Sequence, residues 1–219
     1  MNILITGTAG GIGHAAAIKF INEGHNVAGF DIKPATIESK NYTHYIVDVT
    51  DEAAYPDINN PNVLVNNAGV QQSGRDIDVN LKALIKITEH YAINNPDIKS
   101  VVNVGSASAI TGSEFPEYAA SKGGILAYTK NVALRLAPNA ICNSINPGGV
   151  ITELNDCVMK DEKLFAQIME LTPLKRWATV EEIADWIYFL AVTNRFMTGQ
   201  NLLIDGGEAG NMHFIWPEE

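Results

Sequence analysis

The sequence predicts an α/β fold: a doubly wound parallel sheet of about seven strands with helices on both faces. Short apolar strand patterns alternate with helical patterns along the 219 residues, and this order builds a parallel sheet through right-handed crossovers. A glycine-rich turn at residues 7–13 directly follows the first strand pattern, at 3–5, and leads into a helical pattern at 15–21. The length suits a sizeable core, so residues 1–219 are expected to form a single domain.

The remaining elements follow in order. Strands are expected at 26–30, 42–47, 63–65, 100–105, 140–145 and 200–204, where short apolar runs are bounded by polar or turn residues. Helical patterns cover 77–91, 118–136 and 180–192, and a further helix is expected to begin near Asp51. Residues 151–175 are mixed and amphipathic, which is typical of a lid or, with equal weight, of surface helices. The apolar tail, 208–219, is expected to pack on a groove or on a neighbouring subunit.

Composition and charge narrow the possible partners. Hydrophobic residues make up 46% of the chain and charged residues 18%, as in soluble globular proteins. The net charge of −10 argues against nucleic acid and anionic membranes as targets, because like charges repel. Neither Cys142 nor Cys157 has metal-ligand spacing, so no metal is expected. With no signal-like segment and no apolar run of bilayer length, a cytoplasmic location is expected.

The glycine-rich turn indicates a dinucleotide site. A strand, a glycine-rich turn and a helix together let the backbone approach a pyrophosphate, which then sits at the helix N-terminus. The second strand ends in Asp31, eighteen residues beyond Gly13, where a carboxylate accepts hydrogen bonds from the ribose of NAD. A 2′-phosphate there would meet a like charge, at a cost of about 4 kcal/mol at 4 Å if nothing such as Lys33 compensates. The alternative is that Asp31 only starts a turn.

Two further strand ends carry polar residues. Asp48 follows the third strand, where it could contact an adenine amino group or, with equal weight, cap the helix expected near Asp51. Asn66-Asn67-Ala68-Gly69 follows the fourth strand. Small and amide residues at that point line the crevice of open α/β sheets, although they are also ordinary turn residues.

Tyr118 and Lys122 indicate proton transfer. They lie four residues apart in the opening of a helical pattern, and so on one helix face. A free phenol has a pKa of about 10, and a nearby ammonium favours the phenolate. The spacing alone is common in helices, but Ser106 at the end of the fifth strand and the glycine-rich turn place a nucleotide site beside it.

Taken together, these motifs resemble the short-chain dehydrogenase/reductase family from about Asn2 to Gly207. The matching segments are Thr6–Gly13, Asp48-Val49, Asn66–Gly69, Asn80, Ser106, Tyr118–Lys122, Pro147-Gly148 with Thr152, Thr198–Gln200 and Asp205–Gly207. The resemblance implies a Rossmann fold and an NAD cofactor. The connection from Asn66 to Asn80, fourteen residues, is shorter than is usual in the family, as is the segment between Asp31 and Asp48. Gly105 replaces a serine that often precedes the catalytic one.

The resemblance also implies a role for each matching residue. Tyr118 exchanges a proton with the substrate oxygen, Ser106 holds that oxygen, and Lys122 binds the nicotinamide ribose. Asn80 positions a water that links Lys122 to solvent. The implied cofactor-binding residues are Gly7, Gly11, Ile12, Gly13, Asp31, Asp48, Val49, Asn67, Ala68, Gly69, Tyr118, Lys122, Pro147, Gly148, Val150 and Thr152. Assembly into a homotetramer or homodimer is implied through helices at 77–92 and 117–136.

The function expected from the sequence is NAD(H)-dependent hydride transfer to or from a small secondary alcohol or ketone. A 3-oxoacyl-thioester reductase is the alternative within the family. Its carrier-protein form fits less well, because acyl carrier proteins are acidic and so is this chain. A non-catalytic NAD(H)-binding redox sensor is the alternative from another class, although such proteins usually lose the tyrosine or the lysine.

Overall fold

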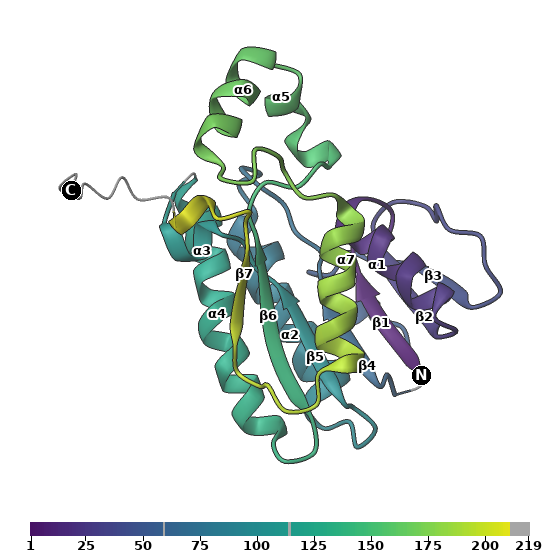
Figure 1. Cartoon of the computed structure of the whole chain (residues 1–219). Helices are drawn as coiled ribbons and strands as arrows, with labels where there is room; N and C mark the ends of the chain where they lie inside the picture. Colours follow the sequence, from purple (N-terminus) through teal and green to yellow (C-terminus); the bar gives the residue numbers. More distant parts are fainter. Residues whose placement is uncertain (59, 114, 211–219) are drawn as a thin grey trace.

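The computed structural model describes residues 1–58, 60–113 and 115–210 (Figure 1). Seven parallel strands form one sheet in the order β3-β2-β1-β4-β5-β6-β7, which confirms the predicted fold class. Its strands are β1 (Asn2–Thr6), β2 (Asn26–Asp31), β3 (Tyr42–Ile46), β4 (Val63–Asn66), β5 (Ser100–Val104), β6 (Ile141–Pro147) and β7 (Asn201–Ile204). The strand order reverses between β1 and β4, and a doubly wound sheet opens its ligand crevice at the carboxyl ends of these strands.

Helices cover both faces of the sheet. One face carries α1 (Gly11–Asn22) and α7 (Val180–Tyr188), which continues as η5 (Phe189–Thr193). The other carries α4 (Pro116–Leu136) and a helix built from η2 (Ile77–Ala83), α2 (Leu84–Thr88) and η3 (Glu89–Ile93). The short elements are η1 (Glu52–Ala54), α3 (Ser108–Thr111), η4 (Glu153–Asn155), α5 (Asp156–Met159), α6 (Glu162–Leu171) and η6 (Glu208–Gly210).

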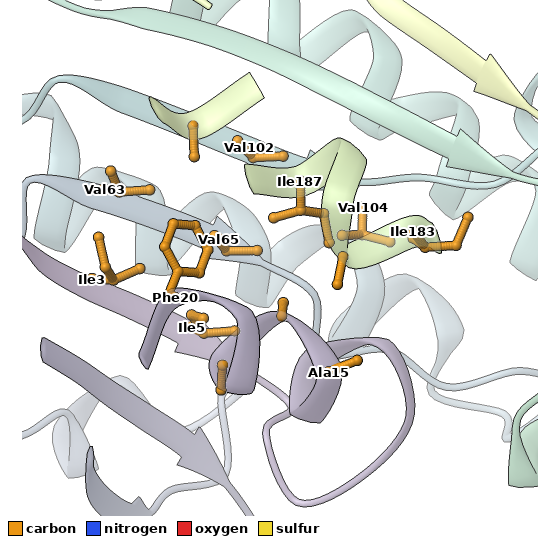
Figure 2. Packing of buried hydrophobic residues seen from close by; sticks show 14 of the residues in the cluster. Ile3, Ile5, Ala15, Phe20, Val63, Val65, Val102, Val104, Ile183 and Ile187 are labelled. Carbon is orange, nitrogen blue, oxygen red and sulfur yellow. The ribbon is translucent and has the colours of Figure 1, made fainter. Parts of the chain in front are cut away.

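The strands are apolar on both faces because each face has its own helical layer. Along β1, Ile3 and Ile5 pack toward α1 and α7, whereas Leu4 packs toward the layer of α2 and α4. Figure 2 shows Phe20 of α1 among Ile3, Ile5 and Val65. The alternation of strand side chains between two cores fixes the register of β1 against β2 and β4.

The helix expected near Asp51 begins at the expected place but is only a single 3-10 turn. The structure has only the three residues of η1 there, and the carboxylate of Asp51 accepts a hydrogen bond from the Ala53 N–H at 3.2 Å. Pro56 and Pro61 follow within ten residues. A proline inside a helix lacks the N–H donor and clashes with the preceding turn, so this segment cannot continue as a helix.

Residues 151–175 form the short helices η4, α5 and α6, which stand beyond the end of the sheet in Figure 1. None of these three helices contains a buried residue. Among the contacts of this segment, the Phe165 ring packs edge-on against Trp177 at 5.1 Å between centroids, and the Leu174 N–H donates to the Gly206 carbonyl at 3.3 Å. Closure of this segment stays a prediction, and most of the tail at 208–219 lies outside the described residues.

Within the part of the chain that the structure describes, every helix is too short or too polar to cross a bilayer.

Candidate active site

A cavity of about 810 Å³ lies at the carboxyl ends of the strands. It receives residues from the ends of β1, β2, β4, β5 and β6, from α4 and from the 151–175 segment. Most residues that the sequence singles out share its wall. They are Gly7, Gly11, Ile12, Asp31, Asp48, Val49, Asn67, Ala68, Gly69, Ser106, Tyr118, Lys122, Pro147, Gly148, Val150 and Thr152. Two others, Gly13 and Asn80, lie behind the wall.

The glycine-rich turn is shaped by close backbone packing. Gly7 has a φ of 77°, a conformation that side chains disfavour, and a Cβ on it would lie 2.8 Å from Asn67 Nδ2. A Cβ on Gly13 would collide with the Gly7 carbonyl. The twelve-residue helix α1 starts behind Gly10 with no side-chain cap and no acidic residue in its first turn. Its N-terminus therefore fits an anion such as a pyrophosphate.

Thr6, which was not among the predicted site residues, organises the junction between the glycine-rich turn and β4. Its Oγ1 accepts hydrogen bonds from the N–H groups of Asn67 and Ala68, at 3.0 and 2.9 Å. The Asn67 amide in turn donates to the Thr6 and Gly7 carbonyls. These bonds hold the strand end 66–69 against the glycine-rich turn. A threonine that ends an apolar strand before glycine was the available signal.

Asp31 and Asp48 stand at one end of the cavity. Asp31 accepts hydrogen bonds from the N–H groups of Ala9 and Lys33, both at 2.9 Å, so it ties the strand end to the glycine-rich turn. Asp48 accepts from the Thr50 N–H at 2.9 Å and hydroxyl at 2.7 Å, and these bonds hold its carboxyl pKa below the ordinary value. The helix-capping interpretation of Asp48 is therefore wrong: Asp48 closes its own turn.

Tyr118, Lys122 and Ser106 meet at the centre of the wall. The first turns of α4 place Tyr118 and Lys122 on one face, with Lys122 Nζ 5.7 Å from the Tyr118 ring centroid. Lys122 Nζ donates to the Val104 carbonyl at 3.1 Å, so the end of β5 anchors it. Ser106 follows β5 directly and its hydroxyl contacts Ser108 Oγ at 3.1 Å. A phenol, an ammonium and a hydroxyl thus face one site.

The short connection from Asn66 to Asn80 still brings Asn80 close to Lys122. The Asn80 side chain accepts from the Val70 N–H at 2.8 Å and donates to the Val70 carbonyl at 2.9 Å and to Ser121 Oγ at 3.0 Å. A Cβ on Gly69 would lie 3.2 Å from Asn80 Oδ1 and 3.5 Å from Lys122 Nζ. Asn80 therefore fixes the loop that follows β4, and both Asn80 and Lys122 lie close to Gly69 of that loop.

The segment after β6 approaches the glycine-rich turn. A Cβ on Gly11 would lie 3.6 Å from Thr152 Cγ2, so the start of the 151–175 segment faces the N-terminus of α1. Gly148 donates its N–H to the Ile204 carbonyl at 3.0 Å, which fixes this segment against β7. At Gly105, a Cβ would collide with the buried Asn146 Oδ1. Glycine rather than serine therefore precedes Ser106 because Asn146 occupies that space.

Burial of the Lys122 ammonium has a cost in the folded protein. Lys122 is 5% exposed, and burial lowers its pKa from 10.5 to about 8, with the charge of Asp76 acting in the opposite direction. Below pH 8 both the folded and the unfolded chain hold the proton, so the folded state carries the full desolvation cost. Between pH 8 and 10.5 the unfolded chain keeps the proton longer, and stability from this group rises with pH.

We therefore expect Lys122→Met to raise the free energy of unfolding at pH 7, by up to about 3 kcal/mol, while removing activity. Thermal melts of the cofactor-free wild type and variant measure this difference in stability. The extra stability of the variant should shrink as the pH is raised to 10.5. Lys130→Met, at an exposed position of the same helix, is the matched control and should leave stability unchanged at both pH values. A Lys122→Met protein less stable than wild type at pH 7 would contradict this.

Among the described residues, His, Cys, Asp and Glu side chains do not gather in any group of three or more that could hold a metal ion.

Nearly the whole chain is similar to known proteins. A sequence profile of enoyl-(acyl carrier protein) reductases matches residues 7–208. The 3-oxoacyl-(acyl-carrier-protein) reductase of Thermotoga maritima is 32% identical over 238 residues, covering 93% of this chain and 96% of that protein. The structure of 4-hydroxyisoleucine dehydrogenase complexed with NADH has a TM-score of 0.88 at 26% identity, covering 96% of this chain and 99% of that one. A crystal structure of an Agrobacterium tumefaciens protein with bound NADP has a TM-score of 0.87 at 27% identity and covers 96% of each chain.

Proposed function

Since this chain belongs to the short-chain dehydrogenase/reductase family, we propose that it transfers a hydride between NAD(H) and a small secondary alcohol or ketone, with Tyr118 as general acid/base. Membership makes it an oxidoreductase of alcohol and carbonyl groups that binds a nicotinamide cofactor. The observation that carries the proposal is the position of Tyr118, Lys122 and Ser106 on the wall of one cavity whose other end is the glycine-rich turn.

The cavity fits a nicotinamide dinucleotide. At one end the uncapped N-terminus of α1 and the bare backbone of Gly10 and Gly11 suit the pyrophosphate. Asp31 and Asp48 suit the adenosine, and Val150 and Thr152, which follow β6 on the same wall, suit the carboxamide. The bound nicotinamide ring supplies or accepts the hydride.

The side chains of the centre divide the remaining work. Tyr118 gives its phenolic proton to the carbonyl oxygen in reduction, or takes the alcohol proton in oxidation. The Ser106 hydroxyl donates a hydrogen bond to the same oxygen, where negative charge develops. The Lys122 ammonium favours the phenolate and holds the ribose hydroxyls. Asn80, which like Lys122 lies close to Gly69, positions a water that carries the proton to and from solvent.

The preference for NAD is attributed to Asp31. Its carboxylate lines the cavity and is fixed by the Ala9 and Lys33 N–H groups. Asp31→Ala is expected to lower the ratio of kcat/KM with NADH to kcat/KM with NADPH by at least about tenfold. The reason is that the substitution removes the charge that repels the 2′-phosphate of NADPH. Asp31→Asn removes the charge but keeps an oxygen that accepts a hydrogen bond from the Ala9 N–H. Comparing the two variants therefore separates the effect of the charge from that of the hydrogen bond. A wild-type enzyme that already prefers NADPH would show that the assignment of Asp31 is wrong.

A 3-oxoacyl-thioester reductase is the second candidate, favoured by the similarity to the Thermotoga maritima reductase. The cavity wall argues against an anionic thioester carrier. The 151–175 segment and η6 each contribute one charged residue to the cavity wall, Glu153 and Glu208. Both are acidic. Because like charges repel, substrates with phosphate or carboxylate groups should bind more weakly than neutral ones.

Nicotinamide absorbance with purified protein tests the proposal. NADH or NADPH is combined with matched neutral and anionic carbonyl compounds, such as acetoin and acetoacetate, with 3-oxoacyl thioesters, and with sugar-derived ketones. The reverse reaction uses NAD and the alcohols. Turnover with NADH and neutral ketones supports the leading function, and preferred turnover of thioesters supports the second. Tight NADH binding without turnover anywhere in the panel would favour the redox sensor.

A further inference from the structure

Residues 70–76 form the last part of the loop between β4 and η2 and are tightly held. Asp76 is 1% exposed, and its carboxylate accepts hydrogen bonds from the N–H groups of Gln72 and Ser73, both at 2.9 Å. Gln72 has a φ of 52°, a backbone conformation that non-glycine residues rarely adopt. With Asn80 bound to both polar backbone atoms of Val70, the loop is fixed at both ends.

This loop presents Arg75 across the cavity to the turn after β3. The Arg75 guanidinium donates to Thr50 Oγ1 at 3.0 Å and lies 3.4 Å from Asp48 Oδ2. Its side chain is 55% exposed, so these contacts hold it in place without burying it. A guanidinium has five N–H donors, and one nitrogen makes both contacts, which leaves donors available to a ligand.

The surroundings of Arg75 suit a flat heteroaromatic ring. Val49, Val79 and the 66% exposed Ile32 provide apolar wall at this end of the cavity. Asp48 and Arg75 add a hydrogen-bond acceptor and a donor side by side. An adenine edge presents an exocyclic amino donor beside a ring-nitrogen acceptor, which is the complementary pattern. Guanidinium planes also stack on nucleobases.

We propose that Arg75 is a cofactor-binding residue that binds the adenine ring from the 70–76 loop. Thr50 positions the guanidinium, and Asp48 presents its carboxylate beside it. The described cavity wall contains three cationic side chains, and each lies at a different part of it. Lys33 follows β2, Arg75 would contact the adenine edge, and Lys122 lies beside Tyr118. The inference rests on the proposed cofactor site, but it concerns affinity for the adenosine half and not the chemical step.

Calorimetric titration with ADP-ribose, NADH and reduced nicotinamide mononucleotide tests this assignment. Arg75→Ala should weaken the binding of ADP-ribose and of NADH by the same factor, about tenfold, because one charge-assisted contact is lost. It should leave the affinity for the mononucleotide, which lacks adenosine, unchanged. Thr50→Val removes both the acceptor that positions Arg75 and the hydroxyl that binds Asp48. It should weaken ADP-ribose binding about threefold.

Two further variants separate the planar contact from charge alone. Arg75→Lys should recover little of the lost affinity, because an ammonium neither stacks nor presents a planar pair of donors. Arg195→Ala removes an exposed arginine outside the cavity and should bind like wild type. Full recovery in Arg75→Lys, or unchanged ADP-ribose affinity in Arg75→Ala, would overturn the assignment of Arg75 while leaving the cofactor site in place. A wild-type protein that binds no ADP-ribose would overturn both.

Discussion

Tyr118→Phe is expected to lower kcat by about a thousandfold or more while leaving the dissociation constant of NADH within about twofold of wild type. The substitution removes one hydroxyl at the cavity wall and keeps the ring that packs beside Lys122. The proton that the substrate oxygen gains or loses then lacks the phenol proposed to transfer it, while Ser106 and Lys122 remain on the same wall. Steady-state rates together with titration of NADH fluorescence separate the loss of the chemical step from a loss of binding.

Tyr128→Phe is the matched control for this experiment. Tyr128 lies on the same helix, but its hydroxyl donates to Glu89 Oε1 at 2.9 Å, outside the cavity. We expect this variant to keep wild-type turnover and at most a small loss of stability, because only one partly buried hydrogen bond is removed. If Tyr118→Phe kept wild-type turnover, the assignment of Tyr118 as general acid/base would be wrong.

Gly13→Ala is expected to cost about 2 kcal/mol of folding stability and at least about tenfold in NADH affinity. In most helical positions alanine is more favourable than glycine by about 1 kcal/mol. At Gly13 the added methyl would overlap the Gly7 carbonyl and press on Asn67 Nδ2, so overpacking outweighs the gain in helix propensity. The glycine-rich turn has to move, and with it the backbone that faces the pyrophosphate.

Gly10→Ala provides the comparison for stability. Gly10 has an extended backbone, with φ at −166° and ψ at 177°, and a Cβ there would meet nothing within 4 Å. We expect its unfolding free energy to stay within about 0.5 kcal/mol of wild type. Chemical denaturation of both variants measures the difference. Equal stabilities for Gly13→Ala and Gly10→Ala would show that the turn tolerates the added methyl without strain.

The sheet was predictable from the sequence because its strands carry local signals. Each central strand is a short apolar run, and β1 alternates between two cores, so the strand positions and the alternating helices could be read without knowing any contact. The helix 77–93 and α7 were predicted for the same reason, since their apolar periodicity is local. The helix expected near Asp51 shows the limit of local signals, because only the three residues of η1 form there. A favourable start does not form a helix when Pro56 and Pro61 follow.

The candidate site was only partly readable. The sequence motifs identified Tyr118, Lys122, Ser106 and the glycine-rich turn, and the fold brings them to one cavity, while their roles stay proposals. For Asp48 the sequence left two interpretations, and only the structure, where its carboxylate binds Thr50, removes the helix cap.

The sequence by itself therefore determined the α/β architecture, the family resemblance and the residue types of the cavity centre, because these follow from local periodicity and from short motifs. Only the tertiary structure showed which distant residues the side chains of Thr6 and Arg75 contact. Thr6 binds the N–H of Asn67, sixty-one residues away, and Arg75 reaches Thr50, twenty-five residues away, from a loop that Asp76 and Asn80 hold. Such contacts depend on how strand ends meet and how turns are bent, and no local pattern encodes either.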